Sequence, residues 1–169
     1  LFNWGCIHDN NPSITHWDRN KLNVLVTELK HTLSIPLLIA AGKLKAKIFR
    51  DIVLLIERFA FRYIYLCNQH AGAVGKIYQE EAAAIRANPN SYNPNNLKRK
   101  LRDLQNTNAP DIVLETSIDN LRFFEEGKSN KPLKYFLINC EYYYRWFKDG
   151  ASGEPKCLDK SVVYVFSDT

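Results

Sequence analysis

The segment LLIERFAFRYIYL, residues Leu54–Leu66, decides the fold of this chain. Its side chains are apolar around almost the whole circumference of a helix, and such a helix is normally central, with other helices packed around it. Its charged residues are Glu57, Arg58 and Arg62, and the two arginines stand one helical turn apart. A buried cation is costly unless it is paired and hydrogen-bonded. The two arginines therefore need partners, either inside the fold or on another molecule.

The arginine pair has a structural and a functional interpretation. Asp51, Arg58 and Arg62 share one stripe of a helix, because steps of seven and four residues return to nearly the same face. In the structural interpretation this stripe pairs internally or with an acidic neighbour helix, so that Arg58 belongs to a buried pair. In the functional interpretation both guanidinium groups face a phosphate backbone. Most helix charges are solvated or paired within the protein, which favours the structural interpretation.

Helical periodicity extends over most of the remaining chain. Leucines recur at three- and four-residue steps in segment 12–34, which predicts one helix there. A new segment begins at Pro36, and the central helix runs from about Lys47 to Asn68. A helix of small residues follows, and Asn95 or Asn96 caps the basic helix LKRKLRDLQN.

Two more helices and a tail complete the prediction. Asp111 starts the segment DIVLETSIDNLRFF, and PLKYFLINCEYYYRWFKDG forms the last helix. The β-branched tail KSVVYVFSD is extended. The predicted fold is mostly α, a bundle of about six helices with a short extended C-terminal tail.

The length of 169 residues fits one domain that buries a single core. We expect an irregular lead-in over residues 1–15, the helical bundle over 16–150 and the tail over 151–169. The chain begins at Leu1 and contains no methionine, so we expect it to be a fragment of a longer protein. The tail then leads to a further C-terminal module.

The composition, 46% hydrophobic and 24% charged, is typical of a soluble globular protein. The longest apolar run is too short to span a bilayer, so we expect no membrane partner. Four scattered cysteines without a C-x-x-C pair suit a reducing cytoplasm. Residues 36–90 carry eight Lys/Arg against four Asp/Glu, most of the net charge of +5, which indicates an anionic partner.

The segment NLKRKLRDL is the densest basic cluster. Lysine and arginine clusters neutralise phosphates and release counterions, which is the source of most non-specific DNA affinity. The acidic residues that follow bring segment 91–130 to no net charge, which favours a solvated amphipathic helix instead. Both interpretations stay open for its four cations, Lys98, Arg99, Lys100 and Arg102.

The sequence predicts no metal or catalytic site. Cys6, His8 and His16 are ligand types, but their spacing matches no zinc pattern and lacks a fourth partner. His31 and His70 are isolated, which is typical of structural histidines. Phosphate-loop, dinucleotide, zinc-protease and nucleophile-elbow motifs are missing, and no carboxylates are spaced as an acid and base pair.

The order of segments resembles a known family. LSIPLLIA, FRDIVLLIERFAFRYI, a polar loop, LKRKLRDL and KPLKYFLINCEYYYRWF resemble the helical middle region of bacterial GmrSD-type restriction and phage-defence proteins, long catalogued as a domain of unknown function. The resemblance covers about Leu22 to Phe166. In that family a ParB-like module with a D-G-Q-Q-R-type motif precedes this region, and an HNH-type nuclease module with an E-H-I-x-P-like motif follows it. This sequence contains neither motif.

The resemblance implies a non-catalytic helical connector or scaffold in a modification-dependent restriction protein. It implies that the parent protein is an endonuclease that uses a nucleoside triphosphate and a divalent metal through modules outside this chain. The candidates for DNA or interdomain contacts are Arg58, Arg62, Lys98, Arg99, Lys100 and Arg102. The alternative is a stand-alone helical module whose basic groups bind a protein partner.

Overall fold

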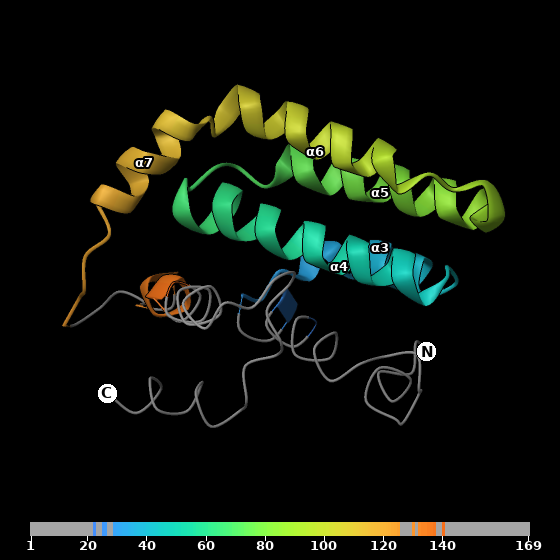
Figure 1. Ribbon diagram of the computed structural model, residues 1–169, viewed down its shortest axis with the longest axis horizontal. Coiled ribbons are helices and arrows are strands. Elements are labelled where there is room, and N and C mark those ends of the chain that lie inside the picture. Colours follow the sequence, from blue (N-terminus) through green and yellow to red (C-terminus); the bar gives the residue numbers. More distant parts are fainter. Residues whose placement is uncertain are drawn as a thin grey trace, which may run out of the picture. The chain divides into compact units, whose positions relative to one another are not determined.

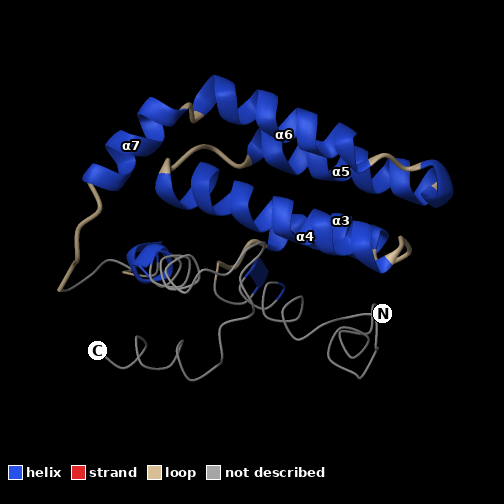
Figure 2. Cartoon of the chain, in the orientation of Figure 1, coloured by secondary structure: helices blue, strands red, loops and turns tan. Residues whose placement is uncertain are grey.

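A computed structural model of the chain describes residues 22, 25, 26, 29–125, 130, 132–137 and 140. The regular secondary structure of these residues is helical, with no strand among them (Figure 2), which confirms the mostly α helical bundle. The chain divides into two compact units, Leu1–Asn120 and Leu121–Thr169. The predicted lead-in and extended tail, and the three ligand-type residues Cys6, His8 and His16, lie outside the described residues.

Helix α4, Ala46–Ala60, carries the predicted central segment and continues directly into the π-helix η3, Phe61–Leu66. It packs against α3, Ile35–Ala41, and against α6, Pro94–Asn108 (Figure 1). The helix ends where Asn68 adopts a φ of 50°, a left-handed conformation that asparagine tolerates better than most residues. Its buried apolar side chains are Phe49, Ile52, Val53, Leu54, Ile56, Phe59 and Ala60.

Helix α5, Gly72–Ala87, packs against both α3 and α6. Its buried stripe recurs at helical spacing and includes Val74, Tyr78 and Ile85. On the facing helix Pro36 lies in the first turn, as predicted, and the alanines Ala40 and Ala41 are buried. Small residues at this contact allow the two helices to approach closely.

The leucine pattern before Pro36 predicts burial correctly except at Leu33, which is 42% exposed, and it predicts the helix length incorrectly. Leu22, Leu25 and Leu29 are at most 4% exposed. However, Lys30 has a φ of 51°, and a short 3₁₀ helix, η2 (Thr32–Ser34), follows it. The expected single helix over 12–34 is therefore wrong at its end, because a residue with positive φ interrupts the helical hydrogen-bond ladder.

The polar segment after α5 forms a short 3₁₀ helix, η4 (Pro89–Ser91), and then α6. The side chain of Asn93 accepts a hydrogen bond from the Asn95 backbone N–H at 3.0 Å. Asn93 is thus the N-cap, and the expectation of Asn95 or Asn96 is wrong, because Pro94 already occupies the first turn.

Helix α7, Asp111–Asp119, begins at the predicted residue and ends before the predicted Phe124. In the second unit the side chain of Asn130 exchanges two hydrogen bonds with the backbone of Phe124, at 2.9 and 2.8 Å. Residues 132–137 are helical, within the predicted last helix. None of the helices among the described residues is long and apolar enough to cross a membrane.

One polar pair lies inside the first unit. The Nε2 atom of His31 lies 3.2 Å from the Tyr78 hydroxyl, and their rings meet edge to face. His31 is 3% exposed and Tyr78 is fully buried. Burial lowers the pKa of the His31 imidazole from 6.5 to about 4 and raises the pKa of Tyr78. Both side chains are therefore neutral at neutral pH, and His31 has the structural role that its isolation predicts.

We expect the fold to lose stability in mild acid because of His31. Above pH 6.5 the imidazole is neutral in both states, so its full contribution is present. Between pH 6.5 and about 4 the unfolded chain binds a proton that the folded chain does not, which lowers the free energy of unfolding. The loss over this interval is about 3 kcal/mol. Urea unfolding at a series of pH values measures it.

His31→Gln places an uncharged amide beside Tyr78 and removes the titrating imidazole, so this variant should lose that part of the pH dependence. His70→Gln is the matched control, because His70 is exposed. An unchanged pH profile in His31→Gln would contradict the assignment.

Candidate nucleic-acid interface

The six candidate cations divide into an exposed and a structural group. On α6, Lys98, Arg99 and Arg102 are exposed, whereas Lys100 is half-buried. Leu97 and Leu101 face the core. At about 100° per residue, Arg99 and Arg102 lie on the side of the helix away from these leucines, and Lys98 lies between the two sides. The cluster that reads as one basic run therefore presents its charges in different directions.

Lys100 joins α6 to α5 through two carboxylates. Its Nζ lies 2.9 Å from Glu80 Oε2 and 2.9 Å from Glu81 Oε1. The Glu81 side chain is only 4% exposed. The Tyr92 hydroxyl donates a hydrogen bond of 2.8 Å to the other oxygen of Glu81. One buried carboxylate thus receives a lysine from α6 and a tyrosine from the segment before it.

Protonation in this network follows from its contacts. The hydrogen bonds that Lys100 donates to Glu80 and Glu81 raise the pKa of Lys100, and the bond and charge of Lys100 lower the pKa of Glu80. Burial, and then the bond to Glu81, raises the pKa of Tyr92. Lys100 therefore stays a cation and Tyr92 stays a protonated donor at neutral pH. The lysine is committed to holding two helices together.

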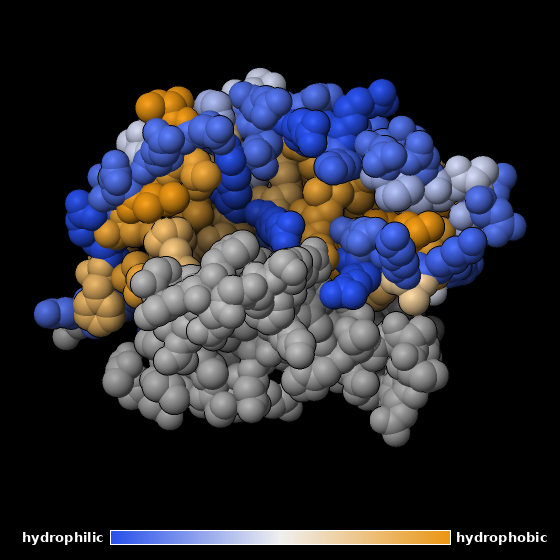
Figure 3. All heavy atoms as spheres, in the orientation of Figure 1, coloured by the Kyte–Doolittle hydropathy of each residue, from blue (hydrophilic) through white to orange (hydrophobic). Residues whose placement is uncertain are grey.

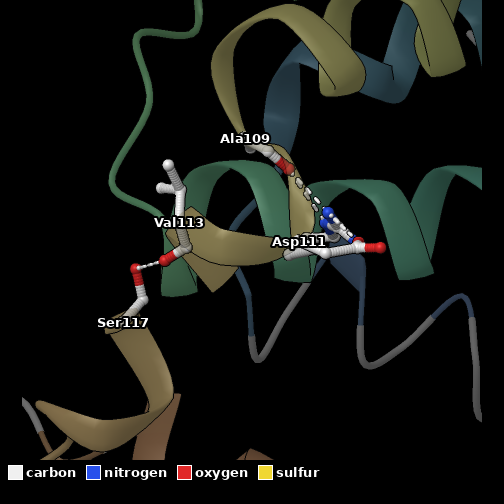
Figure 4. A network of polar contacts seen from close by, with 5 residues as sticks. Ala109, Asp111, Val113 and Ser117 are labelled. Atoms are coloured by element: carbon white, nitrogen blue, oxygen red, sulfur yellow. Dashed lines mark hydrogen bonds and ion pairs between the residues drawn. The ribbon is translucent and has the colours of Figure 1, made fainter. Parts of the chain in front are cut away.

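Arg62 holds the junction between α6 and α7. Its Nη2 donates to the carbonyl oxygen of Ala109 at 2.6 Å and to Asp111 Oδ1 at 2.7 Å (Figure 4). Its Nε also approaches the same carbonyl, at 3.3 Å. The neighbouring Tyr63 hydroxyl accepts a bond of 3.0 Å from Asn108 Nδ2. Two side chains of η3 thus bind the carboxyl end of α6.

Arg58 differs from the expectation. It is exposed, as is Asp51, so a buried pair at Arg58 is wrong. The stripe of Asp51 and Arg58 lies about 100–160° around α4 from Ile52 and Ile56, which are fully buried. The end of α6 packs near the far end of this stripe and engages Arg62.

The sequence did not predict that two acidic residues would be buried in the core. Glu57 and Glu81 are each 3% exposed. For Glu81 a signal exists, because it follows Tyr78 by three residues and precedes Ile85 by four, and so shares their stripe. An acidic residue in an apolar stripe requires a cation or donor, and Lys100 and Tyr92 fulfil that requirement.

The outer face of α6 is the accessible basic surface of this helix. We define it as five exposed residues, Asn95, Lys98, Arg99, Arg102 and Asn106. The last four of these residues come three, four, seven and eleven positions after Asn95, which is the spacing of one helix face. Within the described part of the chain, its three cations form no ion pair or side-chain hydrogen bond. Figure 3 shows mostly hydrophilic side chains over α6.

A shallow groove of about 500 Å³ lies between α5 and α6. Its lining residues are Ala73, Lys76, Ile77, Glu80, Lys100, Asp103, Leu104 and Thr107. Two lysines and two carboxylates balance each other there, so the groove has no preference for an anion. Across the described ranges, no three His, Cys, Asp or Glu side chains are grouped so that they could hold a metal ion.

No protein-family model matches the chain, and no curated protein matches it. The resemblance to GmrSD-type proteins therefore stays a prediction from the order of its segments. The candidate interface depends on geometry and charge alone.

Lys100→Ala should destabilise the fold more than Lys98→Ala, a matched change two residues away on the same helix. Removing Lys100 leaves the buried Glu81 without its cation. An exposed ion pair contributes about 0.2–1 kcal/mol, and breaking a fully buried pair costs about 3–5 kcal/mol. The expected loss of stability in Lys100→Ala lies between these two values. Lys98→Ala should change stability by about 0.5 kcal/mol or less. Chemical denaturation compares them, and equal midpoints would contradict the role of Lys100.

Arg62→Ala should destabilise the fold by about 1–3 kcal/mol, because the buried carbonyl of Ala109 loses its donor. Arg58→Ala removes a cation of the same type one turn earlier and should cost about 1 kcal/mol or less. Thermal melts of the two variants measure the difference. A larger effect at Arg58 would show that the junction does not depend on Arg62.

Proposed function

We propose that this chain is a non-catalytic helical connector that binds DNA through the outer face of α6, within a GmrSD-like modification-dependent restriction protein. The observation that carries the DNA role is the separation of cations on α6. Lys100 is used inside the fold, while Lys98, Arg99 and Arg102 gather on one exposed face. The order of segments that resembles the family supports the connector role.

The outer face of α6 suits a polyanion. Its members are three cations and two amides, and the exposed carboxylate of Asp103 lies at the edge opposite Lys98. Cations on one face neutralise several phosphates at once, and the release of counterions then supplies affinity. Amide side chains add neutral hydrogen bonds to phosphate or sugar oxygens. The face therefore has the composition of a DNA contact.

The anchoring of α6 supports a connector role. Lys100 fixes the middle of the helix to α5, and Arg62 and Tyr63 fix its carboxyl end to η3. A helix held at two points keeps a bound duplex in a defined orientation relative to the rest of the fold. Such an element can position a nuclease that acts on the same DNA.

The proposal extends to the parent protein. A ParB-like module with a nucleoside triphosphate would precede this chain, and an HNH-type nuclease with a divalent metal would follow it. The cytoplasm is the proposed location, where such a protein meets invading DNA. Catalysis belongs to those modules, and this chain supplies scaffold and contacts.

One observation favours a second candidate, a helical protein-interaction module. Helix α7 has no fully buried residue, and its Ile112 is 67% exposed. Exposed apolar side chains on a helix can dock against another protein. The basic residues of α6 would then serve the same protein partner.

DNA titrations at several salt concentrations test the first candidate. The chain should bind duplex DNA, with affinity that falls as salt rises. Combined Ala substitutions of Lys98, Arg99 and Arg102 should reduce the slope of log affinity against log salt by about 1 to 3, because each cation that neutralises a phosphate contributes about 0.9. Fluorescence anisotropy of a labelled duplex measures the slope.

The matched control replaces Lys43, Lys45 and Lys47 with Ala. These residues are also exposed, and the change in net charge is the same. The control should keep the slope of the unmodified chain. Equal losses in both variants would mean that binding follows net charge. No binding even at low salt would reject the DNA role and favour the protein-interaction module.

A further inference from the structure

The centre of the outer face of α6 contains two guanidinium groups with an amide group on either side of them. With about 100° per residue, Asn95, Arg99, Arg102 and Asn106 lie opposite the buried Leu97. Lys98 lies at one edge of this face. We infer that α6 enters the major groove of B-form DNA, where these four side chains contact base edges and Lys98 contacts a phosphate. This inference rests on the proposed DNA function.

The chemistry of the four central residues matches the major groove. Arginine donates two hydrogen bonds to the O6 and N7 atoms of guanine. Asparagine pairs in the same bidentate way with the N6 and N7 atoms of adenine. A face that served only phosphates would need cations alone, and lysine would serve there as well as arginine. The face instead combines the two residue types that read purines.

The dimensions of α6 also fit. The stretch from Asn95 to Asn106 is about 17 Å long at 1.5 Å per residue, which corresponds to about five base pairs. A helix is about 10–12 Å in diameter with its side chains, and the major groove is about 12 Å wide. The cap at Asn93 and the anchors at Lys100 and Arg62 hold the helix firmly. A rigid helix can keep several side chains in register with the bases.

The geometry of the groove selects the partner. A-form RNA has a deep and narrow major groove that side chains cannot read. Single-stranded DNA has no groove and is held mainly by stacking on aromatic side chains, and the outer face contains none. The proposed occupant is therefore a B-form DNA duplex.

Selection from a pool of randomised DNA duplexes tests the inference with the full chain. The unmodified chain should enrich a short motif of about five base pairs. The double variant N95A/N106A should bind the enriched duplex about 25-fold more weakly or worse, because each of the two bidentate base contacts contributes about fivefold or more. Its salt slope should stay unchanged, since amides release no counterions.

The matched control is N90A/N96A. Both of these asparagines are exposed, but Asn96 lies beside the outer face of α6 and Asn90 precedes the helix. The control should keep the motif and the affinity of the unmodified chain. Thermal melts of both double variants verify that they are folded. Equal affinity of N95A/N106A and its control for the enriched duplex would overturn the inference.

The remaining outcomes separate this inference from the proposed function. A chain that retains DNA duplexes but enriches no motif contacts phosphates only, so the inference fails and the DNA function stands. A chain that binds an RNA duplex of the enriched sequence equally well also overturns groove entry. A chain that retains no duplex at low salt refutes both and leaves the protein partner.

Discussion

The ion pair between Lys100 and the buried Glu81 determines how α6 lies on the rest of the first unit. A carboxylate with a 4% exposed side chain needs a cation, and Lys100 and the hydroxyl of Tyr92 are the groups that meet it. This contact fixes the rotation of α6 about its own axis. Because Lys100 points toward α5, Lys98, Arg99 and Arg102 are directed toward solvent.

The sequence predicted the parts of the fold that depend on apolar patterning. The helix content, the burial of Leu22, Leu25 and Leu29, and the start of α7 at Asp111 all follow from periodicity and capping rules. The backbone conformations of single residues could not be predicted from these rules. A positive φ at Lys30 has no signature in the lysine itself, and the choice of Asn93 among nearby asparagines depends on Pro94.

The sequence predicted that four cations lie close together on α6, but it did not predict which of them are exposed on the surface. Sequence spacing brings four cations together, yet it cannot tell which of them a distant carboxylate engages. Glu81 lies nineteen positions before Lys100 in the sequence, and only the packing of α5 against α6 brings them together. Arg58 and Arg62 show the same limit. They share a helix stripe, but Arg62 is half-buried against the end of α6 and Arg58 is exposed.

The division of cations between two roles has a physical logic. A charge that holds helices together must be partly withdrawn from water, and its hydrogen bonds are then committed to the protein. A charge that binds phosphate must keep its donors available until the ligand arrives. On α6 the helical repeat places the two roles on different sides, so the structural lysine stabilises the face on which the exposed cations stand. Loss of Lys100 should therefore disturb the outer face even though Lys100 is not part of it.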